Sequence, residues 1–303
     1  MSEASRVLPH RGPAVEAEAP GEPPRKNYWS GVTRRLLSDR VSMICGTILV
    51  LIVLMALLAP WLAPVDPNAT SIVRRLRGIG SPGHLLGTDE LGRDMLSRLI
   101  FGTRLSLFMG ITPVLIALVF GSLLGVTAGY VGGWVNTIIM RITDVFFAFP
   151  SVLLAVAISG ALGAGIGNAI LSLTIVFIPP ITRVAESVTT QIRTADFLDA
   201  ARASGVGTSR IVRVHVLRNV LGPIIVYATS LISVSMIIAS GLSFLGIGVE
   251  PPNAEWGLML NTLRPAIFVN PTIAALPGVM IFITSICFSL FSDGLRAAME
   301  VKS

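Results

Sequence analysis

Six long apolar stretches, separated by polar segments, dominate the chain after its first 40 residues. They cover roughly 41–63, 105–130, 135–160, 165–184, 220–246 and 272–291. Each is close to the ~20 residues that a helix needs to cross a ~30 Å hydrocarbon core. Because a spanning segment must satisfy its own backbone hydrogen bonds, and these stretches are too long for barrel strands, the pattern predicts helices. We therefore expect an all-α polytopic membrane protein with six transmembrane helices.

The composition agrees with this pattern. Of 303 residues, 52% are hydrophobic and only 13% are charged, whereas a typical soluble domain is about one quarter charged. So little polar surface argues against a soluble enzyme, and so much apolar content argues against a chain disordered throughout. The two cysteines, Cys45 and Cys287, lie inside apolar stretches without metal-like spacing, so we interpret them as small buried hydrophobic residues.

The charges predict an orientation. Residues 1–24 contain five prolines and four glutamates, which predicts a disordered segment. Five basic residues then precede the first apolar stretch: Arg25, Lys26, Arg34, Arg35 and Arg40. Since positive charge is retained in the cytoplasm, we expect residues 1–40 to form a cytoplasmic tail, and six spans return the carboxyl end to the same side. The segment 64–104, on the other side, is an exception because it carries six arginines.

Several residues inside the apolar stretches have a predicted structural role. Gly121, Gly125 and Gly129 form a repeated small-xxx-small pattern, which favours close approach of another helix. Arg141 and Asp144 lie three residues apart, so we expect them to pair with each other, and a structural pair is favoured over a role in translocation. Prolines at four further positions are expected to kink or break the second, third and fourth helices: Pro113, Pro150, Pro179 and Pro180.

Enzymatic motifs are missing from the sequence. Neither Lys26 nor Lys302 follows a glycine, so there is no Gly-Lys-Ser/Thr phosphate loop. The three histidines are dispersed, and no Gly-x-Ser-x-Gly nucleophile elbow is present. We assign no catalytic, cofactor-binding or metal-binding residue, and no basic stripe with interleaved aromatics suggests nucleic acid. Transport, or a scaffold in a membrane assembly, remains.

The polar segment 186–218 reads as two short helices separated by a turn at residues 205–207. Gly205 is placed to end the first helix in a left-handed conformation. Alanines at 200, 201 and 203 leave a slim surface that another protein can approach closely. From the residues alone, a docking surface and an amphipathic helix lying on the membrane both remain open.

A resemblance to a known protein family favours the docking surface over the helix lying on the membrane. The stretch DAARASGVGTSRIVRVHVLRN, residues 199–219, resembles the EAA loop of ABC importer permeases. Asp199, Ala200 and Ala201 occupy the EAA positions and Gly205 occupies the glycine of that pattern. Asp199 replaces glutamate with the charge preserved, and Arg218 stands where proline is usual. Segments 85–107, 141–155, 241–260 and 291–300 are similar, in family order, to the C-type permease of the dipeptide/oligopeptide/nickel group.

The resemblance implies a type I ABC importer permease fold in a bacterial cytoplasmic membrane. It implies a B-type permease as heterodimer partner, two cytoplasmic ATPase domains that hold ATP and Mg²⁺, and an extracytoplasmic binding protein. Residues 105–295 would form the permease core, 186–218 the coupling loop and 296–303 a cytoplasmic tail. ATPase docking is expected at five residues: Asp199, Ala200, Ala201, Arg202 and Gly205.

The cargo implied is a di- or oligopeptide. The same machinery importing nickel, glutathione, haem or another small solute is the alternative. A stand-alone secondary transporter is less favoured, because the sequence shows no clear repeat, and a pure scaffold is a further alternative. Residues 87–97 are expected to meet the binding protein or the partner permease, or to form an interfacial amphipathic helix.

Overall fold

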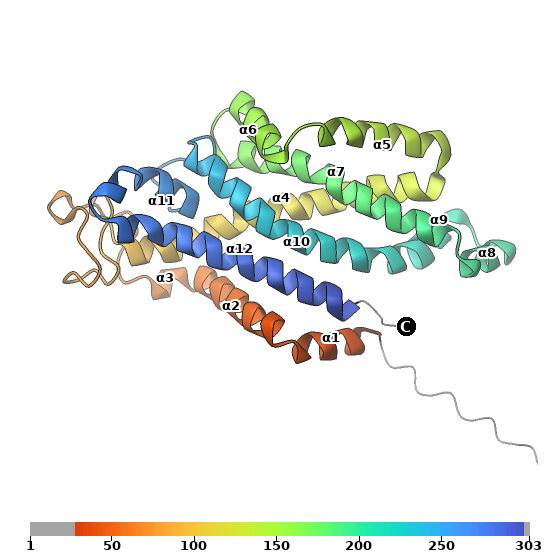
Figure 1. Cartoon of the computed structure of the whole chain (residues 1–303), viewed down its shortest axis with the longest axis horizontal. Coiled ribbons are helices and arrows are strands. Elements are labelled where there is room, and N and C mark those ends of the chain that lie inside the picture. The colour runs from red at the N-terminus through yellow and green to blue at the C-terminus, as the bar shows by residue number, and fades with distance from the viewer. Residues whose placement is uncertain (1–27, 300–303) are drawn as a thin grey trace, which may run out of the picture.

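Long apolar helices lie side by side through most of the chain (Figure 1). The computed structural model describes residues 28–299. Its α-helices are α1 (Tyr28–Ser38), α2 (Arg40–Leu57), α3 (Ala59–Leu62), α4 (Met95–Val131), α5 (Gly133–Phe147), α6 (Ser151–Leu162), α7 (Ile166–Arg193), α8 (Asp196–Ala203), α9 (Thr208–Arg210), α10 (Leu217–Phe244), α11 (Trp256–Thr262) and α12 (Pro271–Met299). Three short helical segments complete the described chain: the 3₁₀ helices Ile72–Arg74 and Pro265–Phe268, and the π-helical turn Ile211–Val216.

Five helical segments are long and apolar enough to cross a membrane: α2, α4, α7, the continuous segment Thr208–Phe244 that ends as α10, and α12. The sixth span is broken, because α5 and α6 bend by 87° at the short break between them. The break follows from Pro150, which lacks an N–H and disfavours helical backbone in the residue before it. With this pair counted as one span the predicted six are present, although 135–160 is not one continuous helix. Pro113, Pro179 and Pro180 instead lie inside helices that continue through them.

A seam of glycines joins α4 to α7. A Cβ atom added to Gly121 would lie 2.9 Å from the Ile181 side chain, and one on Gly125 would lie 2.9 Å from the backbone nitrogen of Glu186. A Cβ on Gly129 would lie 2.7 Å from the Glu186 carbonyl oxygen. These separations are shorter than a real Cβ tolerates, so the two backbones touch only because the residues are glycines. The structure therefore places all three predicted packing glycines on one face, against α7.

Two hydrophobic cores fill the bundle. One runs along α4, α7 and α10 and includes fully buried residues such as Leu173, Ile181 and Ile224. The other lies among α2, α4, α11 and α12 and includes the buried side chains of Met95 and Trp256. Because α4 and α10 contribute to both cores, they hold the two halves together.

Three predicted segment boundaries change. Within the expected tail 1–40, residues 28–38 form α1, and Asp39 caps α2 by accepting a hydrogen bond from the backbone N–H of Ser42 at 3.0 Å. The expected loop 186–218 is shorter, because α7 continues to Arg193 and α10 begins at Leu217. Residues 296–299 continue α12. Residues 1–27 and 300–303, and the disorder expected for 1–24, lie outside the described residues.

The bundle has two different ends (Figure 1). We call one the loop end, residues 63–94 and 245–270, which carries the loops before α4 and around α11. We call the other the α8 end, residues 194–216, which connects α7 to α10. Helix α4 begins at the loop end and runs toward the α8 end, so the position of a residue along α4 is also its position between the two ends of the bundle.

Candidate functional site

Helix α8 projects from the bundle and is fastened by its inner face. Asp196 and Asp199 lie in its first turn, where acidic side chains favour the helix dipole. Leu198 is fully buried and belongs to the same hydrophobic core as Ile211 and Val216 of the π-helical turn. This core also contains residues of α7 and α10. Leu198 therefore attaches α8 to the core that both flanking spans share.

The outer face of α8 is open. Asp199 and Arg202 form an ion pair of 2.7 Å between exposed side chains, and Ala200 is exposed beside them. The hydrogen bond to Asp199, and to a smaller extent one to Tyr130, raises the pKa of the Arg202 guanidinium. Four of the five predicted docking residues are thus exposed, and only Ala201 is half-buried against the core.

Phe197 of α8 is also exposed, although it was not among the predicted docking residues. Its side chain is 45% exposed, three residues before Ala200. An aromatic side chain left in water on a short polar helix is typical of a contact surface. The signal in the sequence was that Phe197 is the lone aromatic residue of this eight-residue helix.

Gly205 ends α8 in the conformation that the sequence predicts. Its φ is +75°, the N–H of Gly205 donates to the Arg202 carbonyl at 3.0 Å, and the N–H of Val206 donates to the Ala201 carbonyl at 3.2 Å. These two bonds form a Schellman motif, which favours glycine because only glycine adopts positive φ without steric cost. Gly207, two residues on, has φ −64° and needs no glycine.

The segment entering α10 tolerates Arg218 in place of proline. Residues 211–216 form a π-helical turn that leads directly into α10, and Arg218 lies exposed in its first turn. The backbone thus remains helical from Thr208 to Phe244.

The predicted pair of Arg141 with Asp144 is wrong. Asp144 on α5 forms its ion pair with Arg183 on α7. The guanidinium of Arg183 also stacks over the Phe147 ring, 4.2 Å from its centroid. Arg141 is exposed and makes no ion pair within the described chain. Asp144 therefore joins two spans rather than two turns of one helix.

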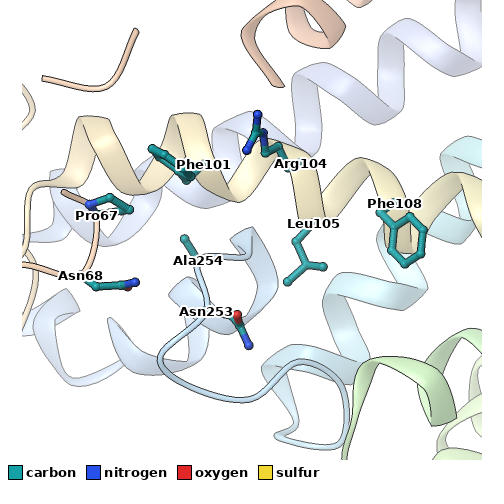
Figure 2. A pocket seen from close by; sticks show the side chains of 8 residues that line it. All are labelled: Pro67, Asn68, Phe101, Arg104, Leu105, Phe108, Asn253 and Ala254. Atoms are coloured by element: carbon teal, nitrogen blue, oxygen red, sulfur yellow. The ribbon is translucent and has the colours of Figure 1, made fainter. Parts of the chain in front are cut away.

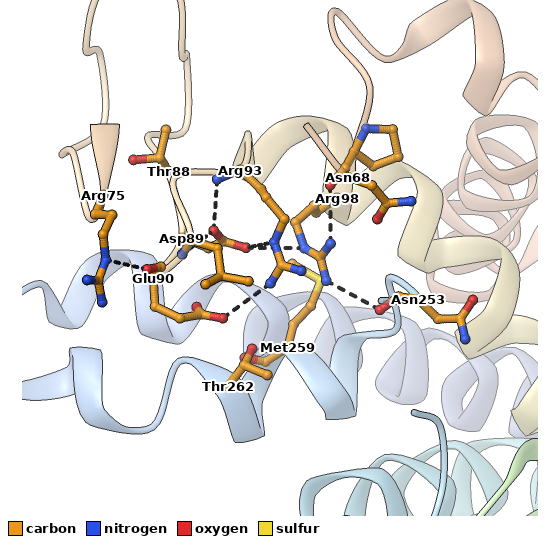
Figure 3. A network of polar contacts seen from close by, with 12 residues as sticks. Asn68, Arg75, Thr88, Asp89, Glu90, Arg93, Arg98, Asn253, Met259 and Thr262 are labelled. Atoms are coloured by element: carbon orange, nitrogen blue, oxygen red, sulfur yellow. Dashed lines mark hydrogen bonds and ion pairs between the residues drawn. The ribbon is translucent and has the colours of Figure 1, made fainter. Parts of the chain in front are cut away.

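A network of buried charges organises the loop end (Figure 3). Asp89 accepts from Arg93 Nε at 2.6 Å and lies 3.4 Å from Arg98 Nε. Arg98 further donates to the backbone oxygens of Pro67 and Asn253, at 3.2 and 3.3 Å. All three charged side chains are buried. A buried charge is tolerated only when it is paired and hydrogen-bonded, so this network ties residues 67–98 to the loop before α11.

Other polar side chains of residues 84–97 also form hydrogen bonds within the chain. Asp94 caps α4 by accepting from the Ser97 N–H at 2.8 Å, and it pairs with His84 Nδ1 at 2.9 Å. Thr88 accepts from the Arg77 N–H at 3.0 Å. Gly87 has φ +78°, and a Cβ there would strike the Arg77 carbonyl. Residues 87–94 form a loop and not the interfacial amphipathic helix that was one expectation for 87–97, because α4 begins only at Met95.

Glu255 and Trp256 attach α11 to α4. The buried carboxylate of Glu255 accepts from the N–H groups of Gly257 and Leu258, both at 2.8 Å, and from Ser106 Oγ at 3.1 Å. Burial raises the pKa of Glu255, and these donors oppose the shift. The indole of Trp256, fully buried, donates to the Leu99 carbonyl at 3.1 Å. The loop end is thus one interlocked unit.

The comparisons with known proteins agree with this architecture. Residues 121–302 match the family model described as "binding-protein-dependent transport system inner membrane component". Residues 27–77 match the model for the N-terminal transmembrane domain of oligopeptide transport permease C. The chain belongs to the binding-protein-dependent ABC importer permeases.

Named relatives of this permease cover nearly its whole length. It is 39% identical to the di/tripeptide transport permease DppC of Pseudomonas aeruginosa, covering 97% of each chain. It is 37% identical to the dipeptide permease DppC of Alkalihalophilus pseudofirmus, covering 97% of this chain and 98% of the relative. It is 38% identical to the glutathione permease GsiD of Pectobacterium atrosepticum, covering 92% and 91%.

The fold of the permease matches a solved transporter. A chain of the MetNI methionine ABC transporter, in an inward-facing conformation, superposes with a TM-score of 0.56 at 22% identity. The match covers 67% of this permease and 97% of the MetNI chain. The all-α, type I importer permease fold and the multi-pass membrane character are thereby established.

A hollow of about 400 Å³ opens at the loop end of the permease (Figure 2). Phe101, Arg104, Leu105 and Phe108 line it from one face of α4, with Pro67, Asn68, Asn253 and Ala254 from the loops. Arg104 donates to the carbonyls of Ala56 and Leu57 at the end of α2. Among the described residues, no group of three or more His, Cys, Asp or Glu is placed to hold a metal ion.

Proposed function

We propose that this permease is the C-type half of an importer of small peptides. Its partners are a B-type permease, two ATPase domains that hold ATP and Mg²⁺, and an extracytoplasmic binding protein. The relatives named for dipeptides, tripeptides and glutathione share one kind of cargo, a short peptide-bonded molecule with charged ends. That shared chemistry supports peptides over nickel or haem.

The ATPases dock on α8, which lies in the cytoplasm with both chain ends. The observation that carries this proposal is the contrast between the faces of α8. Asp199, Ala200 and Phe197 are exposed, whereas Leu198 is buried in the core that also contains residues of α7 and α10. Closure of the ATPases moves α8, and Leu198 passes that movement to the spans. A lever of this kind biases inward- against outward-facing states through its different contacts in each.

Reconstitution tests the proposal. The complex with its permease and ATPase partners is placed in liposomes, and ATP hydrolysis is measured with binding protein carrying di- to pentapeptides. We expect loaded binding protein to stimulate hydrolysis. Stimulation by nickel- or haem-loaded binding protein alone would change the cargo, and solute flux through this chain without ATPases would contradict the mechanism.

The coupling role has a matched pair of variants. Gly205→Val places a branched side chain at φ +75°, whereas Gly207→Val places the same side chain at φ −64° with open space around its Cβ. We expect Gly205→Val to abolish peptide-stimulated hydrolysis with normal insertion, and Gly207→Val to retain most of it. Equal activities of the two variants would remove the role of the α8 turn.

A further inference from the structure

A groove about 410 Å³ in volume lies between α10 and α12, which run side by side in the bundle (Figure 1). Ser233 and Ile237 line it from α10, and one face of α12 lines it between Gly278 and Ser289. We call it the α10–α12 groove. None of the described residues that line it carries a charge, and large apolar side chains such as Phe282 are exposed along it. The groove is therefore an open, apolar surface between two spans.

The α10–α12 groove lies inside the apolar band of the bundle. At the α8 end, the edge of this band is marked by Gly294, which packs against Ser42 at the start of α2, and by Asp293 beside it, the first charged residue of α12. Ser285 precedes Asp293 by eight residues, so it lies about 12 Å inside this edge. The uncharged part of α12 extends back from Ser285 to Pro271, about 21 Å toward the loop end. An occupant of the groove is therefore embedded in the membrane.

One buried hydroxyl of the groove lacks a hydrogen-bond partner. Ser285 is 6% exposed, and its Oγ forms no hydrogen bond within the described chain. Thr284, the residue before it, donates to the Met280 carbonyl at 2.7 Å. Ser233, on the other wall of the groove, likewise bonds to a carbonyl of its own helix. A polar group left unsatisfied at membrane depth costs free energy, so Ser285 points to an occupant that supplies the missing hydrogen bond.

Small residues of α12 leave room for another helix in the groove. Gly278, Ser285 and Ser289 are spaced by seven and four residues, so they lie on one face of α12. A Cβ on Gly278 would lie 3.7 Å from the Leu260 side chain, which is an ordinary contact. Packing inside the chain therefore does not require this glycine, unlike the glycines of α4 against α7. Small residues at such spacing are typical of interfaces between membrane helices.

A membrane helix is the occupant that meets all of these requirements. A lipid chain offers no hydrogen bond to Ser285, and a hydrated path does not suit walls that expose Ile237, Phe282 and Ile286. Polar side chains that bond across small-residue faces hold membrane helices together. We propose that a transmembrane helix of the B-type permease lies in the α10–α12 groove and accepts a hydrogen bond from the Ser285 hydroxyl. The proposal rests on the proposed function, because it names the surface at which that partner binds.

Photo-cross-linking in the membrane tests where the partner helix lies. A photoreactive phenylalanine analogue replaces either Phe282 in the groove or Leu51 on α2, whose side chains are 65% and 59% exposed. This chain is produced with a tagged B-type permease and the ATPases, and the membranes are irradiated. We expect an adduct of the two permeases from position 282 and not from position 51. Adducts of position 282 with lipid alone or with a second copy of this chain, or a stronger adduct from position 51, would overturn the proposal.

Variants of Ser285 test the hydrogen bond and the fit of the helix. We expect Ser285→Ala to raise the dissociation constant of the heterodimer about threefold, as for the loss of one hydroxyl bond between membrane helices. Ser285→Leu also fills the groove and should raise it about tenfold. Thr47 of α2 gives the control, because its exposed hydroxyl donates to the Met43 carbonyl of its own helix at 2.8 Å. Thr47→Ala and Thr47→Leu should leave subunit exchange unchanged, and equal effects at both positions would contradict the groove as the interface.

The melting temperature separates a lost partner contact from a folding defect. Because the Ser285 hydroxyl has no partner in the part of the chain that the structure describes, Ser285→Ala should leave the melting temperature of this subunit in detergent unchanged. A clear drop would assign the hydroxyl to the fold of this chain and overturn the proposal. A wild-type chain that forms no heterodimer would contradict the proposed function itself, whereas a heterodimer that hydrolyses ATP and ignores both Ser285 variants would overturn the groove alone.

Discussion

The two ends of the bundle use the same ion pair, an aspartate with an arginine, in opposite ways. At the loop end, Asp89 lies buried between Arg93 and Arg98. At the α8 end, Asp199 and Arg202 pair in the open. Buried charges must be completed within the chain, whereas exposed pairs contribute little and stay available to a partner. The loop end is therefore completed by its own residues, whereas the α8 end leaves its pair exposed, as the proposed docking of the ATPases requires.

This difference fits the proposed importer, in which the ATPases act on the α8 end. Rigid attachment of α11 to α4 by Glu255 and Trp256 holds the loop end as a unit. Only Leu198, with half-buried Ala201, packs α8 against the core, so this end is attached more weakly than the loop end.

The largest effect is expected from breaking the buried network. Asp89→Ala leaves the guanidinium groups of Arg93 and Arg98 buried without their shared carboxylate, so we expect it to cost about 3–5 kcal/mol of unfolding free energy. Asp199→Ala removes the exposed counterpart and should leave unfolding unchanged within error. Denaturation of both purified variants in detergent measures this. Similar losses in the two would erase the distinction between the ends.

Variants of two neighbouring residues of α8 should separate an effect on stability from an effect on ATPase binding. Leu198→Ala empties a fully buried site and should cost about 2–5 kcal/mol, measured by thermal unfolding. Phe197→Ala removes an exposed ring and should instead weaken ATPase binding about tenfold, as for the loss of an aromatic anchor, with the melting temperature unchanged. A destabilised Phe197→Ala with normal ATPase affinity would mean that this face is not the docking surface.

A larger residue in the glycine seam should destabilise the packing of α4 against α7. Gly125→Val places a side chain against the α7 backbone, and overpacking of this kind costs about 1–3 kcal/mol. Gly160→Val in α6 has open space around its Cβ and serves as the control. Detergent unfolding of the two variants gives the difference. A tolerated Gly125→Val would show that α4 and α7 can separate without loss.

Features that depend on residues close in sequence could be predicted, whereas contacts between distant segments could not. Hydrophobic periodicity and the spacing of Gly121, Gly125 and Gly129 are local, so the six spans and a close-packed face followed from the sequence. The partner of Asp144 did not, because Arg183 lies on another span and the pairing depends on how α5 packs against α7. The burial of Leu198 beside exposed Phe197 likewise depends on where α8 meets the core.

The smallest effect distinguishes backbone conformation from side-chain contact at the α8 end. A Cβ at either Gly205 or Gly207 meets nothing within 4 Å, so alanine at either site adds no clash. Only Gly205 has positive φ, and an L-residue there costs about 1–2 kcal/mol. Gly205→Ala should therefore speed amide hydrogen exchange in α8 several-fold, while Gly207→Ala should not. Because positive φ and the Schellman bonds to Arg202 and Ala201 distinguish Gly205 from Gly207, faster exchange in both variants would locate the weakness in the loop and not in the turn.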